Sequence, residues 1–207
     1  MNDLQDIIDF KLHPIDDLNY YVKRCRSELQ KNSILILNNF LAEKPLVNLQ
    51  REGQSLHNKA FYCSQSHNVL LAEKNIQLDD KHPCNIEVVS DKGCVPHDLI
   101  PENSSLRIVY NSTLFKNFIQ SLLSVEKVYP YADTLSSINY NYYEKNQQLG
   151  WHFDNASFAI SLMIQSPISG GSFQYVVDAR NVEKKILNVQ LIDSVLQNKY
   201  PVKELRI

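Results

Sequence analysis

The spacing of apolar residues changes along the chain, and this change predicts helices first and strands later. Residues 15–31 place apolar side chains three or four positions apart, with acidic residues at the start and basic residues at the end. They predict a helix that covers a sheet. Residues 45–61 predict a second helix, since they open with a proline suited to a first helical turn. A third helix is expected after Ser112, a good N-cap residue, and the apolar run 33–40 predicts a short strand.

From Thr134 onward, apolar and polar residues alternate, which predicts β-strands. Strands are expected over three stretches joined by short turns, namely 134–145, 157–165 and 172–179. Consecutive strands with short turns predict an antiparallel meander, and hence a sandwich or a barrel. Residues 61–104 are rich in loop-forming residues, and a strand is expected there only at 86–90.

Composition places the chain among single-domain globular proteins. Of its 207 residues, 43% are apolar and 21% are charged, enough for one sizeable core. We therefore expect one domain over residues 1–207, with a helical and loop-rich part over 1–130 and a strand-rich core over 131–207.

Charge and hydropathy narrow the kinds of partner. The net charge is −2, and basic residues form no stripe, which argues against a nucleic acid or an anionic membrane as partner. A small-molecule or protein partner fits better. No apolar run approaches the roughly 18 residues of a membrane span, and the N-terminus lacks a secretory pattern, so the expected location is the cytoplasm.

The most informative stretch is LGWHFDN, residues 149–155. In an extended backbone, His152 and Asp154 point to one side while Trp151 and Phe153 point to the other. An imidazole and a carboxylate held together in this way suit a divalent transition metal, and with one more histidine they form the facial triad of non-haem iron. An ordinary surface pair or a hydrogen-bonded core histidine explains the same spacing.

The four cysteines are too widely spaced for a disulfide framework, so free thiols are expected. His82 and Cys84, followed by Cys94 and His97, offer ligands that zinc accepts. Their spacing matches zinc motifs poorly, and cysteine in such turns often packs as a small hydrophobe, which is the preferred interpretation.

A longer stretch gives the motif its context. DTLSSINYNYYEKNQQLGWHFDNASFAISLMIQSP, followed by GGSFQYV, resembles the iron(II)- and 2-oxoglutarate-dependent dioxygenases, in particular bacterial small-molecule hydroxylases related to carrier-free amino-acid hydroxylases and halogenases. FYCSQSHNVLL and VVSDKGCVPHDLIP are similar to the same group, so the resemblance covers about residues 60–180. It implies an α+β or mostly β fold, with a double-stranded β-helix (jelly-roll) core and N-terminal helices packed outside it.

The resemblance implies roles for four residues. His152 and Asp154 match the first two iron ligands. An aspartate in the second place is the hydroxylase pattern, because the related halogenases vacate it for chloride. Asn141 and Tyr143 resemble an N-x-Y pair that contacts 2-oxoglutarate, although two polar residues on an exposed strand face explain them equally well. The implied activity is hydroxylation of a small molecule such as a free amino acid, with 2-oxoglutarate converted to succinate and carbon dioxide.

The C-terminal part departs from the family pattern. Relatives supply a second histidine and then an arginine that pairs with 2-oxoglutarate, yet no histidine follows His152, and neither Arg180 nor Arg206 matches that arginine by position. His67, in SQSHN, is not favoured as a replacement iron ligand, and a capped surface turn is expected there.

Three explanations of this departure remain open. The chain is a truncated, impaired hydroxylase whose last strands are missing, a non-catalytic jelly-roll module that binds a ligand or a partner, or one part of a site that a second chain completes. A jelly roll without its final strands has open sheet edges, which favour homo-oligomers.

Overall fold

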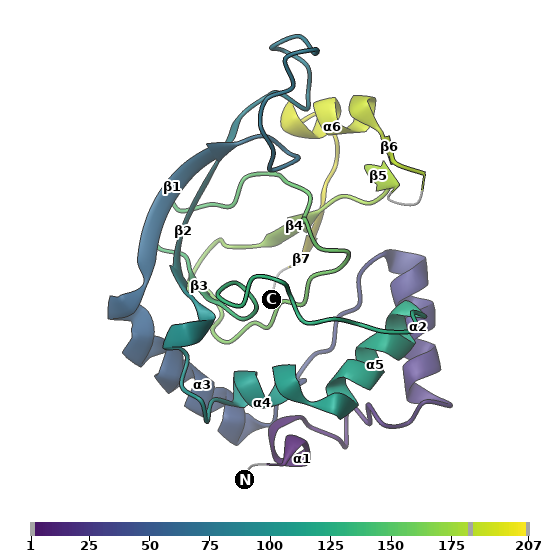
Figure 1. Cartoon of the computed structure of the whole chain (residues 1–207), viewed down its shortest axis with the longest axis vertical. Helices are drawn as coiled ribbons and strands as arrows, with labels where there is room; N and C mark the ends of the chain where they lie inside the picture. The colour runs from purple at the N-terminus through teal and green to yellow at the C-terminus, as the bar shows by residue number, and fades with distance from the viewer. Residues whose placement is uncertain (1–2, 182–183, 206–207) are drawn as a thin grey trace. The chain divides into compact units, whose positions relative to one another are not determined.

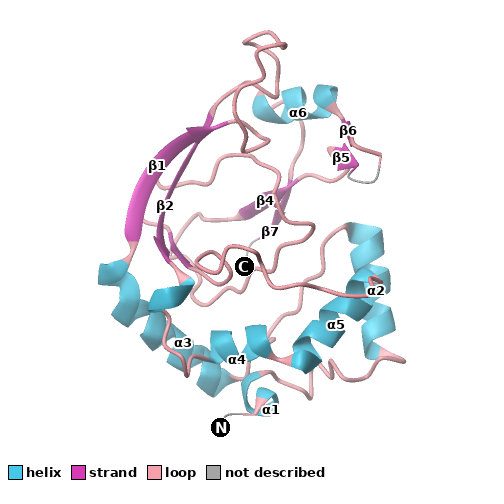
Figure 2. Ribbon diagram, viewed as in Figure 1, coloured by secondary structure: helices cyan, strands magenta, loops and turns pink. Residues whose placement is uncertain are grey.

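The chain folds into two compact units, each assembled from separate parts of the sequence. The computed structural model describes residues 3–181 and 184–205. The first unit runs up to Ala60 and resumes over Cys94–Tyr140, while the second comprises Phe61–Gly93 and the described residues from Asn141 onward. Helices dominate the first unit, whereas strands and long loops make up most of the second (Figure 2).

The first unit is built from α-helices and short 3₁₀ helices: α1 (Leu4–Ile7), α2 (Tyr21–Asn32), α3 (Glu43–Leu56), η1 (His57–Lys59), η2 (His97–Leu99), α4 (Ser105–Asn111) and α5 (Thr113–Leu123). Helix α2 packs against α5. Their shared core includes Tyr21, Val22 and Cys25 from α2, and Phe118 and Leu122 from α5. The expectation that this helix covers a sheet is therefore wrong, because the apolar stripe of α2 meets another helix instead.

Helix α2 begins six residues later than the apolar spacing predicts, because Asp17 stabilises a turn in front of it. The Asp17 carboxylate accepts hydrogen bonds from the backbone N–H groups of Asn19, Tyr20 and Tyr21. These donors, that of Tyr20 foremost, lower the pKa of Asp17. The turn leaves Leu18, one of the apolar residues spaced at helical intervals over 15–31, 52% exposed.

The predictions for the other two N-terminal helices are confirmed, but the early strand is not. Helix α3 with η1 covers most of 45–61, and α5 starts directly after Ser112, whose hydroxyl accepts a hydrogen bond from Phe115 N at 3.2 Å. Residues 33–40 form no strand. Their leucines pack against the helical core instead.

Most strand residues lie in the second unit, together with helix α6 (Val189–Leu196). The strands are β1 (Phe61–His67), β2 (Val88–Val95), β3 (Tyr140–Tyr142), β4 (Phe173–Tyr175), β5 (Arg180–Asn181), β6 (Ile186–Leu187) and β7 (Lys203–Leu205). One sheet has the order β1-β2-β3, while β4 pairs antiparallel with β7, and β5 with β6 (Figure 1). Strands β2 and β4 were predicted in part, whereas β1 was missed.

The predicted meander is not present in the described chain. Of its three expected strands, the first survives as β3 and the third as β4, but these belong to different sheets. Residues 157–165 form no strand, and Phe158, Ile160 and Leu162 are each more than one third exposed. Alternation alone therefore did not define a strand here, because strand formation also depends on packing against a neighbouring strand.

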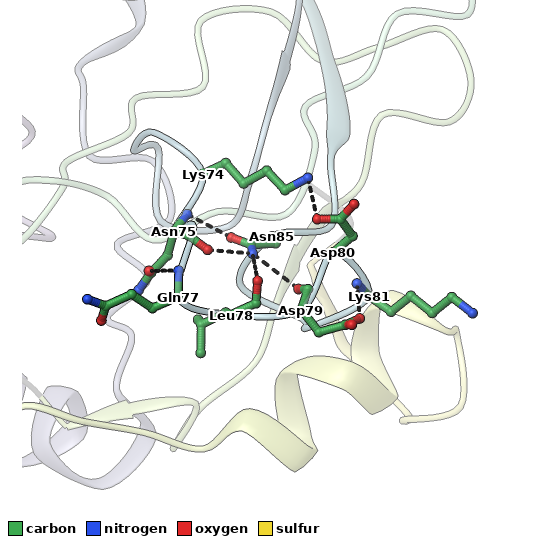
Figure 3. Close-up of polar contacts among 8 residues, drawn as sticks. All are labelled: Lys74, Asn75, Gln77, Leu78, Asp79, Asp80, Lys81 and Asn85. Atoms are coloured by element: carbon green, nitrogen blue, oxygen red, sulfur yellow. Dashed lines mark hydrogen bonds and ion pairs between the residues drawn. The ribbon is translucent and has the colours of Figure 1, made fainter.

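A buried asparagine organises the loop between β1 and β2. The Asn85 amide donates to the backbone carbonyls of Asn75, Leu78 and Asp79, and its oxygen accepts from Asn75 N at 3.0 Å (Figure 3). These bonds satisfy backbone groups that no regular structure pairs. The loop therefore has a defined course without a helix or a strand.

The core of the second unit lies where β-strand, loop and helix residues meet. Val69, Ala179 and Ile192 are buried together, and Trp151 and Phe153 pack against them. Among the described residues, no helix has the length and apolar character needed to cross a membrane.

Candidate functional site

The predicted motif lies in the second unit, on a segment without regular secondary structure. Trp151 and Phe153 pack into the core, while the side chains of His152 and Asp154 are 20% and 57% exposed. The predicted alternation of side chains is thus confirmed, although the segment is not a strand.

Hydrogen bonds fasten this segment to neighbouring parts of the second unit. Phe153 N donates to Val69 O at 2.8 Å, and Asp91 N donates to Gln148 O at 2.7 Å. The Gln147 amide also donates to the Asp91 carboxylate, at 3.1 Å. The motif is therefore held by β2 on one side and by the chain after β1 on the other.

The structure brings His152 and Asp154 together. Nε2 of His152 lies 3.5 Å from Oδ1 of Asp154. At the other edge of the ring, Nδ1 of His152 donates to Gly150 O at 2.7 Å, because a carbonyl oxygen can only accept. In the neutral ring, Nε2 then carries a lone pair that faces the Asp154 carboxylate.

Three residues near this pair were missed or given little weight in the sequence. The His67 ring lies edge to face with the His152 ring, at 5.8 Å between centroids and an angle of 86°. Ser90 accepts a hydrogen bond from Gly150 N at 3.0 Å, and Arg180 donates to the Asp154 carbonyl at 3.1 Å. They come from three distant segments, and no spacing rule connects such positions.

Arg180 also stacks on the motif. Its guanidinium carbon lies 4.8 Å from the centroid of the Phe153 ring. A cation above an aromatic face is attracted to the ring, which helps to keep this side chain beside Asp154. Arg206, which was also considered in the sequence, lies outside the described residues.

The predicted cosubstrate pair lies on β3 and just beyond it. Asn141 is within β3, Tyr143 directly follows the strand, and both side chains are exposed. Their contact with 2-oxoglutarate stays a prediction.

The stretch around His67 differs from the expected surface turn. His67 is the last residue of β1. Asn68 does cap a turn, since its oxygen accepts from Leu70 N at 3.0 Å, but it is buried rather than on the surface. A strand was not predicted because FYCSQSH combines polar residues with only a weak alternation.

The described structure does not gather the cysteine and histidine residues considered for zinc. In the parts of the chain that the structure describes, no three His, Cys, Asp or Glu side chains gather as a metal ion requires. Cys84 is buried, and burial raises the pKa of its thiol, which disfavours the thiolate that binds metal. It packs as a small hydrophobe, the interpretation preferred from the sequence.

Comparison with known proteins places this site within a family. A family model described as halogenase D matches residues 18–203, which is most of the chain and includes both predicted metal ligands. No curated protein and no solved structure matches significantly.

Proposed function

Because the chain belongs to the halogenase D family, we propose that it is an oxidative enzyme that hydroxylates a small molecule such as a free amino acid, with iron(II) and 2-oxoglutarate. The family supports oxidative chemistry in general. The metal, the cosubstrate and the choice of hydroxylation are our inference from the site.

The proposal rests mainly on two hydrogen-bond acceptors that lie close together, Nε2 of His152 and the Asp154 carboxylate. Nδ1 of His152 uses its proton on Gly150 O, so Nε2 presents a lone pair to the Asp154 carboxylate, 3.5 Å away. Two acceptors so close repel each other, and a proton or a metal ion between them removes this repulsion. Two donor atoms bound side by side on an octahedral ion are about 3 Å apart, so the observed separation suits a metal after a small adjustment.

Asp154 favours hydroxylation over halogenation. A halogenating iron centre of the type that the sequence resembles leaves the carboxylate position empty, so that chloride can bind the metal. Here a carboxylate occupies that position and competes with the halide. When bound, iron(II) and 2-oxoglutarate supply an oxidant derived from oxygen, and His152 and Asp154 hold the metal beside the substrate.

The remaining parts of the proposal follow from the resemblance. Asn141 and Tyr143 contact the cosubstrate, the second unit is the counterpart of a jelly-roll core, and the partner is a small molecule, consistent with a net charge of −2. Arg180, which donates to the Asp154 carbonyl, places a positive charge beside the motif.

The proposal can be tested by anaerobic titration of the chain with iron(II) and 2-oxoglutarate, following the weak visible charge-transfer band of the chelate. We expect a band in the wild type and a more than about 10-fold loss of iron affinity in His152→Ala and in Asp154→Ala. His82→Ala is the matched control, because His82 accepts a hydrogen bond from Cys84 N and lies outside the motif.

A second candidate is a non-catalytic binding module. It is favoured by the lack of a third gathered His, Cys, Asp or Glu ligand among the described residues. Equal iron affinity in the wild type and in His152→Ala, with no band in either, would support the module and contradict the enzyme. If a band appears, oxygen and candidate amino acids can be added, and a product that gains oxygen rather than chlorine supports hydroxylation.

A further inference from the structure

A directed chain of hydrogen bonds runs from His67 to His152. Nδ1 of His67 lies 3.0 Å from Asn68 O and must donate to it, so in the neutral ring Nε2 of His67 is an acceptor. The Ser90 hydroxyl, 2.5 Å from that nitrogen, therefore donates to His67 and is left to accept from Gly150 N. The Gly150 carbonyl then accepts the Nδ1 proton of His152. With both histidine rings neutral, every proton in this series of hydrogen bonds is assigned.

Gly150, at the centre of this chain, lies directly against β2. A Cβ atom at this position would be 2.7 Å from Cγ2 of Val88 and 2.8 Å from the Val89 carbonyl oxygen. Only glycine permits so close an approach. A glycine backbone is flexible, and here the Ser90 hydroxyl restrains it by accepting a hydrogen bond from Gly150 N.

His67 acts on the His152 ring from a second direction. The two rings are nearly perpendicular, with centroids 5.8 Å apart, so His67 is in ring contact with the His152 imidazole. His67 is itself held, because both of its ring nitrogens have partners. Rotation of the His152 ring is restricted as a result.

We propose that Ser90 and His67 are positioning residues for His152, which hold it as the Nδ1–H form with Nε2 directed at Asp154. This inference rests on the proposed function only in taking that nitrogen as the metal-binding atom. Partners of this kind behind a metal-binding histidine fix its tautomer and orientation, and their loss typically weakens metal binding by about 10- to 100-fold.

The geometry favours this role over direct metal binding by His67. A ligand nitrogen has to be free, yet Nε2 of His67 accepts from Ser90 and Nδ1 donates to a backbone carbonyl. His67 also joins no group of three potential ligands within the described ranges.

The first test uses the metal-free chain. With ¹⁵N-labelled histidine at a pH where the rings are neutral, the ring nitrogen shifts of His152 should report the Nδ1–H form in the wild type. We expect Ser90→Ala to shift this signal towards the Nε2–H form that an unrestrained histidine prefers. Ser90→Thr keeps the hydroxyl and should restore the wild-type signal. Ser64→Ala, which removes an exposed hydroxyl from β1, is the control.

The second test is titration of the same variants with cobalt(II), a spectroscopically visible substitute for iron. We expect Ser90→Ala and His67→Ala to weaken binding about 10-fold, and Ser90→Thr and Ser64→Ala to leave it near the wild-type value.

The outcomes separate this inference from the proposed function. An unchanged His152 signal in Ser90→Ala overturns the positioning role, whatever the metal affinity. Loss of cobalt binding in His67→Ala as complete as in His152→Ala, with Ser90→Ala unaffected, overturns it in favour of His67 as a ligand. A wild-type chain that binds no cobalt contradicts the proposed function, while the nitrogen signal still decides whether Ser90 positions the ring.

Discussion

At the scale of single residues, backbone carbonyls decide where histidine protons lie. In the first unit, Nε2 of His13 is 2.8 Å from Asn38 O and donates to it, so Nδ1 accepts from the Tyr21 hydroxyl at 2.6 Å. In His152 a backbone carbonyl, that of Gly150, likewise fixes the proton, but on Nδ1 instead of Nε2. The sequence showed which histidines exist but not these assignments, because the deciding carbonyls belong to residues of no special type.

Replacing Tyr21 by phenylalanine should make stability less sensitive to alkaline pH. Burial raises the pKa of Tyr21 above its usual 10.0, so its neutral form stabilises the fold below pH 10, and this contribution is lost as the pH rises further. At pH 7, Tyr21→Phe should cost about 1–3 kcal/mol, because His13 loses its donor.

Urea unfolding at pH 7, 9 and 10.5 measures this effect. The difference between wild type and Tyr21→Phe should shrink towards the highest pH. Burial also raises the pKa of the Cys25 thiol, and Tyr21→Phe removes the hydrogen bond between this thiol and the Tyr21 hydroxyl. Comparing the two chains in a Cys25→Ala background therefore isolates the ionisation of Tyr21. A difference that stays constant over the whole range would show that Tyr21 ionisation does not limit alkaline stability.

Gly150→Ala should disturb both the stability of the fold and the orientation of His152. The added methyl group would lie within 3 Å of β2 backbone and side-chain atoms, so the segment must move. We expect a loss of about 1–3 kcal/mol in urea unfolding and a changed His152 nitrogen signal.

Gly170→Ala provides the comparison. Gly170 has a positive φ of 68°, but no atom lies within 4 Å of the place that an added methyl carbon would take. Its substitution should therefore cost about 1–2 kcal/mol through backbone strain alone. The His152 signal should then stay as in the wild type. Equal effects of both substitutions on that signal would argue against the specific contact of Gly150 with β2.

At the scale of elements, helices were predicted better than strands. The repeat that defines α3 and α5 is local, and Ser112 supplies its own cap, so sequence alone was sufficient. Strands depend on partners that the local sequence does not identify. Thus β1 was missed, and β4 pairs with β7 rather than with the predicted neighbours.

The segment 157–165 is expected to be the preferred site of chymotrypsin cleavage. It has no strand partners in the described structure, and Phe158 and Leu162 are each 37% exposed. Proteases bind such extended, accessible backbone readily. Mass spectrometry of a brief digest should show cuts at these residues before any at Phe118, which is buried in α5.

Protection of this segment would contradict that expectation. It would indicate that residues 157–165 pair in solution, as the predicted jelly-roll strand requires. The digest therefore also bears on the fold that the resemblance implies.

At the scale of the whole molecule, the LGWHFDN motif predicted which residues lie together better than the pattern of apolar and polar residues predicted the arrangement of the chain. His152 and Asp154 could be selected from the sequence because a spacing of two residues brings side chains together in any extended backbone. Their supporting residues could not, since Ser90 lies 60 positions from its partner Gly150. The helical and strand-rich parts were expected at 1–130 and 131–207, whereas the two observed units each combine early and late segments.

The attachment of His152 to a backbone carbonyl has an evolutionary consequence. The hydrogen bond that orients this ring ends on Gly150 O and does not involve the Asp154 side chain. Aspartate and glycine codons differ by one nucleotide. If the proposed iron site forms, one mutational step at position 154 therefore exchanges the carboxylate for an open coordination position while the histidine keeps its orientation. Under that proposal, oxygen transfer and halogen transfer are neighbouring activities in sequence space, separated at position 154.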